Sequence, residues 1–81
     1  MDDRHLKEYK FEVNNKEFET TESELLGAQI KTIASVPAGY QLFLEVPGEK
    51  KEDRLIADGD RVDLSLPGKQ KLYTVPPATF G

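Results

Sequence analysis

The feature that most constrains the fold is an alternating hydrophobic pattern near the start of the chain, broken by two consecutive asparagines. Tyr9, Phe11 and Val13 lie two residues apart with charged residues between them. This period-2 pattern is typical of a strand that buries one face. Asn14-Asn15 then favours a two-residue turn, because asparagine tolerates positive φ better than other non-glycine residues. The pattern therefore predicts the first strand and the turn of a β-hairpin.

The return strand of this hairpin is expected over residues 16–20, with Phe18 pointing inward. The charges of Lys16, Glu17 and Glu19 would discourage pairing with other chains if this strand lies at a sheet edge. Residues 1–6, before the hairpin, are charged and aperiodic. We expect a disordered N-terminal tail there.

A single main helix is predicted, with two candidate starts. Thr21 and Glu24 have the spacing of a capping box, which would begin the helix near Glu22. Gly27 favours a later start, because glycine is a poor residue inside a helix. We favour the later start and a helix over residues 26–35. Its apolar positions form one stripe that can lie on a sheet face: Leu26, Ile30, Ile33 and Ala34.

The densest strand signal follows the helix, over residues 40–46. Leu42 and Leu44 would share one side of this strand and Phe43 the other. If the leucines face the helix, Phe43 lies on the opposite sheet face, which nothing in so short a chain covers. An exposed aromatic residue there is a candidate partner-binding surface. The reverse register, with Phe43 in the core, stays open.

Three further segments complete the expected fold. Residues 54–57 can form a short strand, residues 62–64 a tight turn that packs two side chains, and residues 71–75 the final strand. A helix that crosses between the second and third main strands must cover one face of a mixed sheet, the α+β solution for a small core. We therefore predict one α+β domain over residues 7–75, a mixed four- to five-stranded sheet packed on one main helix. Its expected core is Phe11, Val13, Phe18, Ile30, Ile33, Leu42 and Leu44.

Charge and composition argue against several classes of protein. The 15 acidic and 11 basic residues give a net charge of −4, so no broad positive field attracts nucleic acid or an anionic membrane. The absence of cysteine excludes disulfides, thiolate zinc sites and a cysteine nucleophile. The polar start of the chain lacks the pattern of a signal peptide, and no apolar run of about 20 residues follows. We expect a cytoplasmic protein.

No constellation of catalytic or metal-binding residues is visible in the sequence. His5 is the only histidine and lies in the expected N-terminal tail, so no serine has a partner for a hydrolase triad. The segment Asp58-Gly59-Asp60, with Asp63, lacks the third spaced ligand and the terminal glutamate of a calcium loop. The glycines form no phosphate-binding motif. We predict no enzyme, no catalytic residue, no metal site and no cofactor.

The order of elements resembles the ubiquitin superfamily, and three segments resemble the bacterial multiubiquitin family of ubiquitin-like proteins most closely. These segments are YKFEVNNKEFETT (9–21), GAQIKTIASVPAGYQLFLEV (27–46) and IADGDRVDLS (56–65). The resemblance implies a ubiquitin-like (β-grasp) fold. It also implies partners from a bacterial conjugation pathway: an adenylating activating enzyme, a conjugating-enzyme-like protein and a deubiquitinase-like zinc protease.

The resemblance directs attention to residues 76–81, the expected extended C-terminal tail. Pro76 and Pro77 oppose a helix and favour an extended chain, which lowers the entropy lost on entering an enzyme channel. Gly81 would carry the carboxylate that the activating enzyme converts into an acyl donor. Phe80 would fill an apolar pocket of that enzyme. The tail departs from the family pattern, because ubiquitin and the sulfur carriers end in Gly-Gly and this chain ends in Phe80-Gly81.

The leading functional prediction is a ubiquitin-like protein modifier or carrier that is activated and conjugated through Gly81. An alternative is a noncovalent β-grasp module for interaction or self-assembly, in which the tail is passive. A second alternative is a sulfur carrier with a thiocarboxylate at Gly81, which the missing Gly-Gly disfavours. The fold alone does not choose among them, since one fold hosts many functions.

Overall fold

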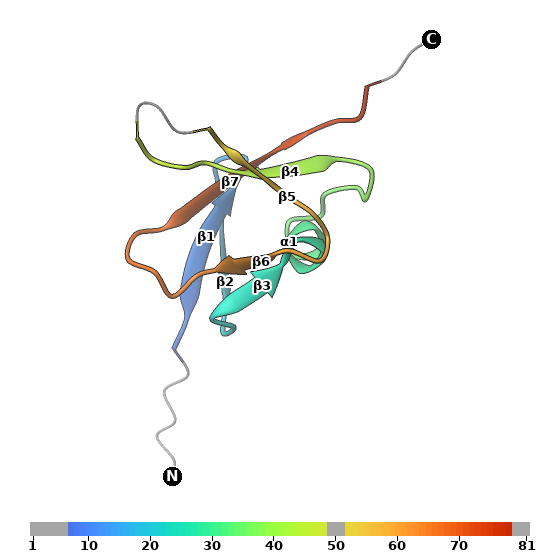
Figure 1. The fold of residues 1–81 in the computed structure, drawn as a ribbon. Helices are drawn as coiled ribbons and strands as arrows, with labels where there is room; N and C mark the ends of the chain where they lie inside the picture. Colours follow the sequence, from blue (N-terminus) through green and yellow to red (C-terminus); the bar gives the residue numbers. More distant parts are fainter. Residues whose placement is uncertain (1–6, 49–51, 79–81) are drawn as a thin grey trace.

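The computed structural model describes residues 7–48 and 52–78, which form two sheets and one helix (Figure 1). The larger sheet has five strands in the spatial order β2-β1-β7-β4-β5. Its strands are β1 (Tyr9–Val13), β2 (Lys16–Thr20), β4 (Gln41–Leu44), β5 (Arg54–Ile56) and β7 (Gln70–Val75). The smaller sheet pairs β3 (Glu24–Leu26) with β6 (Arg61–Asp63), and helix α1 spans Gly27–Ile33.

The N-terminal hairpin is confirmed. Asn14 and Asn15 have φ values of 54° and 68°, as a two-residue hairpin turn with positive φ at both positions requires. The turn places Val13 opposite Lys16 and Phe11 opposite Phe18. β2 is an edge strand of the larger sheet, the position at which its charges would discourage pairing with other chains.

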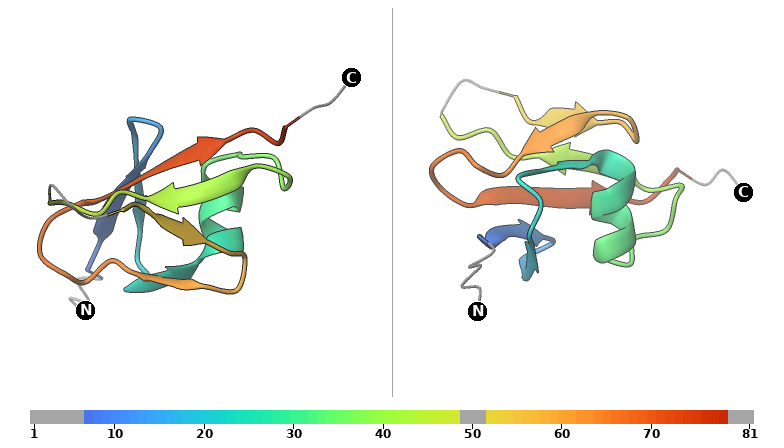
Figure 2. Two further views of the ribbon diagram at one scale, coloured as in Figure 1. Left: turned by 45° about the horizontal axis from the view of Figure 1, so that its top comes forward. Right: turned by 90° about the horizontal axis from the view of Figure 1, so that it is seen from below.

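The two ends of the domain meet at the centre of the larger sheet. β7 pairs in parallel with β1 and antiparallel with β4, so the sheet is mixed. A parallel pair needs a crossover connection, and α1 lies within it, on the same side of the larger sheet as the smaller sheet (Figure 2). This arrangement confirms the predicted fold, a mixed five-stranded sheet of the β-grasp type with one helix.

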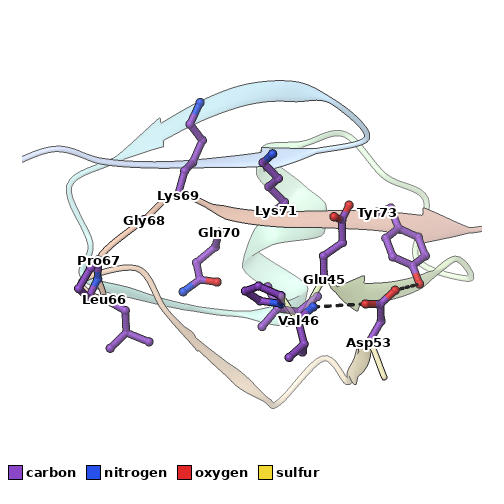
Figure 3. A pocket seen from close by; sticks show the side chains of 12 residues that line it. Glu45, Val46, Asp53, Leu66, Pro67, Gly68, Lys69, Gln70, Lys71 and Tyr73 are labelled. Atoms are coloured by element: carbon purple, nitrogen blue, oxygen red, sulfur yellow. Dashed lines mark hydrogen bonds between the residues drawn. The ribbon is translucent and has the colours of Figure 1, made fainter. Parts of the chain in front are cut away.

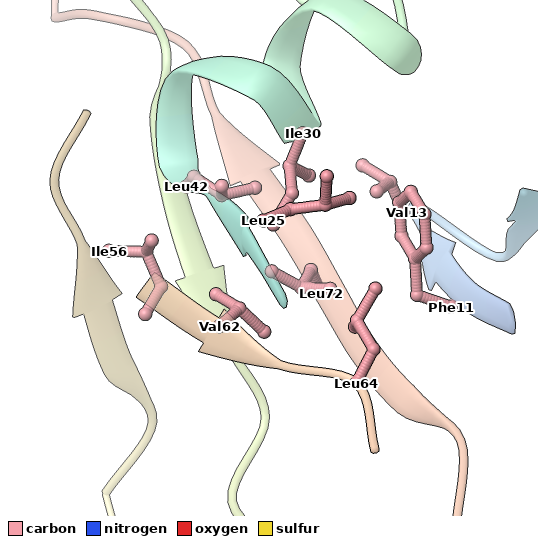
Figure 4. Packing of buried hydrophobic residues seen from close by; sticks show 9 residues of the cluster. All are labelled: Phe11, Val13, Leu25, Ile30, Leu42, Ile56, Val62, Leu64 and Leu72. Carbon is pink, nitrogen blue, oxygen red and sulfur yellow. The ribbon is translucent and has the colours of Figure 1, made fainter. Parts of the chain in front are cut away.

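The core lies between the larger sheet and the layer formed by α1, β3 and β6 (Figure 4). Four of the predicted core residues are fully enclosed, and Phe18 and Leu44 are half-buried against them. Among the described residues, nine hydrophobic residues are buried: Phe11, Val13, Leu25, Ile30, Leu42, Ile56, Val62, Leu64 and Leu72.

The prediction that Ile33 belongs to the core is wrong, since its side chain is 37% exposed. The buried residues of α1 are Gly27 and Ile30. With about 3.6 residues per turn, Ile33 lies about 120° around the axis from Gly27, away from the sheet. The helix is also shorter than predicted at both ends, because Leu26 belongs to β3 and Ser35 has a φ of +58°.

Gly27 is the first residue of the helix and lies where no larger residue fits. A Cβ atom at this position would lie inside contact distance of the Ala57 carbonyl oxygen and 3.1 Å from Cγ2 of Ile56. The same close approach lets the Gly27 N–H donate to the carbonyl oxygen of Asp60 at 2.9 Å. Gln29 completes the first turn by accepting a hydrogen bond from the Leu26 N–H at 2.8 Å. The later helix start is therefore confirmed.

The prediction that the backbone of residues 62–64 forms a tight turn is wrong. Instead, Arg61–Asp63 forms β6 and pairs antiparallel with β3, with Val62 opposite Leu25. The expected inward packing of two side chains holds, because Val62 and Leu64 are both buried. Strands of three residues are too short to show a period, so this pairing was missed.

Replacing Ile30 with alanine should lower the free energy of unfolding by about 2–5 kcal/mol, because the change removes enclosed methyl groups and leaves a cavity. Ile33→Ala is the matched control on the same helix and should cost less than about 1 kcal/mol, because Ile33 is 37% exposed and lies outside the core. Urea unfolding of both variants measures the difference. Equal losses would contradict this assignment of the two isoleucines.

Candidate functional site

Apolar side chains gather on the sheet face that points away from the helix. Phe43 of β4 lies opposite Leu55 of β5 and Tyr73 of β7, so the three residues form one row across three strands. Val75 lies two residues after Tyr73 and therefore on the same face. Leu55 is 52% exposed and Val75 is 37% exposed. We call Phe43, Leu55, Tyr73 and Val75 the outer patch.

Phe43 lies in this patch and outside the core. Its neighbour Leu42 is fully buried beneath the sheet, whereas Phe43 is half-buried on the opposite face. The Phe43 ring stacks on Tyr73, with ring centroids 5.3 Å apart and planes 12° apart. The structure therefore has the register in which the leucines face the helix, and the alternative with Phe43 in the core is wrong.

The ring of Tyr73 is held by the connection between β4 and β5 (Figure 3). The Tyr73 hydroxyl donates to Oδ2 of Asp53 at 2.7 Å, and the Val46 N–H donates to Oδ1 of the same carboxylate at 3.2 Å. The hydrogen bond to Asp53 is the main reason why the pKa of Tyr73 is raised, and desolvation adds to it. Asp53 thus ties the outer patch to the end of β4.

A groove of about 760 Å³ lies beside this hydrogen bond (Figure 3). Its walls come from the segment after β4 and from the connection between β6 and β7, including Leu66, Pro67 and Lys69. The groove lies at the start of β7, and the tail leaves from the end of that strand. Gln70, Lys71 and Tyr73 of β7 also line the groove, so it reaches the outer patch at Tyr73, two residues before the strand ends.

The C-terminal tail begins at the edge of the outer patch. Val75 ends β7, and residues 76–78 are exposed and belong to no helix or strand. The tail passes the loop between α1 and β4, because a Cβ atom on Gly39 would lie 3.9 Å from Cγ of Pro77. Of the residues predicted to act in the tail, Pro76 and Pro77 are described, and Phe80 and Gly81 lie outside the described residues.

Two lysines, Lys31 and Lys69, form ion pairs between different elements of the fold. Lys31 of α1 contacts Oδ1 of Asp58 at 3.3 Å, with only 11% of its side chain exposed, and so joins the helix to the turn before β6. Lys69 contacts Glu12 at 3.0 Å and Glu17 at 3.7 Å. The hydrogen bond to Glu12 is the main cause of the raised pKa of Lys69.

Within residues 7–48 and 52–78, no group of three or more His, Cys, Asp or Glu side chains is placed to hold a metal ion. The same residues include no helix that is long and apolar enough to cross a membrane. His5, the only histidine, lies outside the part of the chain that the structure describes.

Sequence and structure together define a ubiquitin-like protein. A family model described as multiubiquitin matches residues 9–76, which cover most of the chain. The chain therefore belongs to the multiubiquitin family. No match to a curated protein or to a solved structure was found.

Sequence reasoning identified Phe43 in the outer patch and missed Leu55, Tyr73 and Val75. The alternation within residues 70–75 places Tyr73 and Val75 on one face of a strand. That signal does not show that Tyr73 lies opposite Phe43, because the register of β7 against β4 depends on packing between segments far apart in the sequence.

Replacing Asp53 with asparagine should lower the pKa of Tyr73 toward its ordinary value, because the neutral phenol loses its charged acceptor. A raised folded-state pKa favours the protonated phenol, so this contribution to stability is complete below about pH 10 and is lost as the pH rises through the folded pKa. An NMR titration of the Tyr73 ring measures the change. Asp58→Asn, in the turn before β6, is the control, and an unchanged Tyr73 pKa in Asp53→Asn would contradict the assignment.

Proposed function

We propose that this chain is a ubiquitin-like protein modifier or carrier, activated and conjugated through the carboxyl group of Gly81. Its partners would be an adenylating activating enzyme, a conjugating-enzyme-like protein and a deubiquitinase-like zinc protease of a bacterial pathway. The observation that carries the proposal is the exposed segment Pro76–Ala78, which leaves the sheet directly beside the outer patch. Membership of the multiubiquitin family supports it.

The geometry suits a partner that grips the domain and the tail together. Leu55 and Val75 offer apolar surface on the same face as Phe43, and Val75 is also the last strand residue before the tail. Docking on the outer patch would fix the position of the first tail residue relative to the enzyme, so that less entropy is lost when the rest of the tail enters the enzyme.

The chemistry needs no catalytic group from this chain. A carboxylate is a poor acyl donor until it is activated. In the activating enzyme, an oxygen of the Gly81 carboxylate would attack the α-phosphorus of ATP and expel pyrophosphate, which leaves an acyl adenylate. A thiolate of that enzyme would then take the acyl group and expel AMP. Glycine leaves the acyl carbon unhindered.

A noncovalent interaction module is the second candidate, and one observation favours it. The outer patch presents Leu55, at 52% exposure, on strand β5 and does not depend on residues after Val75. In that case binding would survive removal of the tail, and the activity of the carboxylate would be absent.

Deleting Gly81 should eliminate adenylate formation while leaving the thermal unfolding midpoint unchanged. The deletion moves the carboxylate back by one residue and leaves the bulky Phe80 at the acyl carbon. ATP–pyrophosphate exchange with the cognate activating enzyme measures the effect. Phe80→Ala retains the glycine and should lower kcat/KM by about tenfold if the ring fills an apolar pocket. Equal exchange by the intact protein and the deletion would refute the modifier proposal.

Leu55→Ala should raise the KM of this chain in the same exchange reaction by about tenfold, because the change removes an apolar contact from the outer patch. Leu66→Ala is the matched control, a leucine with the same 52% exposure that lies in the groove at the start of β7. Phe43→Ala should also weaken binding more than it lowers stability. A KM unchanged in both Leu55→Ala and Phe43→Ala would exclude the outer patch as the docking surface.

A further inference from the structure

The parallel pair at the centre of the larger sheet ends before the tail begins. Its backbone register runs as far as Val13 opposite Leu72, whereas β7 continues to Val75. The Asn14 N–H still donates to the carbonyl oxygen of Leu72 at 3.0 Å. Beyond that bond the chain turns away from β7, because Asn14 has a φ of 54° and is the first residue of the hairpin turn. The last residues of β7 therefore extend past the backbone of β1.

The side chain of Asn14 replaces the missing backbone of β1. Its Oδ1 accepts a hydrogen bond from the Thr74 N–H at 3.0 Å, and its Nδ2 donates to Oγ1 of Thr74 at 2.9 Å. In a regular parallel pair, the Thr74 N–H would donate to a backbone carbonyl oxygen of the neighbouring strand. The amide group of Asn14 thus extends the pairing along β7 to the residue immediately before Val75.

The hairpin turn itself does not require this side chain. A two-residue turn with positive φ at both positions accepts glycine at either position. Asn15, the other turn residue, has a comparable φ of 68°. The role of Asn14 in the turn can therefore be separated by substitution from its contact with Thr74.

The end of β7 is held on both of its edges. On the β4 edge, Val75 lies opposite Gln41. On the β1 edge, Thr74 is held by the side chain of Asn14. A strand end with one neighbour would be free to pivot about that neighbour, whereas contacts on both edges leave it one direction. Since Pro76 follows directly, this direction is also that of the first tail residue.

We propose that Asn14 is a positioning residue for the activation step, because its side chain fixes the direction in which the tail leaves the sheet. This inference rests on the proposed function, since the direction matters only where an enzyme binds the domain and the tail together. A tail that already has the bound direction loses less entropy when it enters the enzyme. Asn14 acts through Thr74 and takes no part in the chemistry at the carboxylate.

Substitutions in the turn separate the two roles of Asn14. Asn14→Gly is the test variant, because glycine keeps the positive φ and removes both hydrogen bonds to Thr74. Asn15→Gly, at the other turn position, is the matched control. Asn14→Asp should restore the behaviour of the intact protein, because an ionised carboxylate accepts bonds from both the N–H and the hydroxyl of Thr74. Thr74→Val removes only the bond at Oγ1 and should have a smaller effect of the same kind.

NMR measures the contact without any enzyme. Hydrogen exchange of the Thr74 N–H should be about tenfold faster in Asn14→Gly than in the intact protein or in Asn15→Gly, because this group loses its acceptor. Nitrogen-15 relaxation should show larger motions at Val75 and Ala78 in Asn14→Gly alone; the two prolines between them have no N–H. Unchanged Thr74 exchange, or unchanged motion at Val75 and Ala78, would overturn the proposal.

ATP–pyrophosphate exchange with the cognate activating enzyme measures the consequence for the reaction. Asn14→Gly should raise the KM of this chain by about tenfold and leave kcat unchanged, because the bound tail reaches the same ATP site from either starting direction. Asn15→Gly and Asn14→Asp should keep the KM of the intact protein. An equal KM for the active intact protein and Asn14→Gly would overturn this inference alone, whereas no exchange by the intact protein would overturn the proposed function as well.

Discussion

The parallel pairing of β1 with β7 is the interaction on which the rest of the structure depends. It brings the two ends of the domain together, with Phe11 opposite Gln70 and Val13 opposite Leu72. Because parallel strands cannot be joined by a tight turn, the chain between them must cross over the sheet at least once, and the helix and the smaller sheet that cover the core belong to this connection. It also sends the tail out from the middle of the larger sheet.

The two sides of the larger sheet have different roles in this arrangement. The inner side is closed by α1, β3 and β6, so its residues serve stability. On the outer side, Leu55 and Val75 are exposed next to the tail. This position suits the proposed partner, which would bind the domain and the tail together.

Local sequence patterns predicted much of this fold, but they missed the β3–β6 pairing and misplaced Ile33. The asparagine turn and the alternation in β1 needed only neighbouring residues, and both are confirmed. The pairing of β3 with β6 was missed, because three-residue strands carry no period and form only where distant segments meet. Ile33 was assigned to the core from helical spacing, but the buried residues of α1 are Gly27 and Ile30, and Ile33 lies beyond this buried stripe with 37% of its surface exposed.

The sequence by itself determined the hairpin, the approximate place of the helix, the separation of Leu42 and Phe43 onto opposite faces, and the exposed character of Pro76-Pro77. These features follow from backbone preferences and from the period of one strand. Only the tertiary structure decided that Phe43, Leu55 and Tyr73 form one row and that Ile33 lines a groove between α1 and the end of β2. Registers and grooves arise where segments far apart in the sequence pack together, and no local pattern specifies that packing.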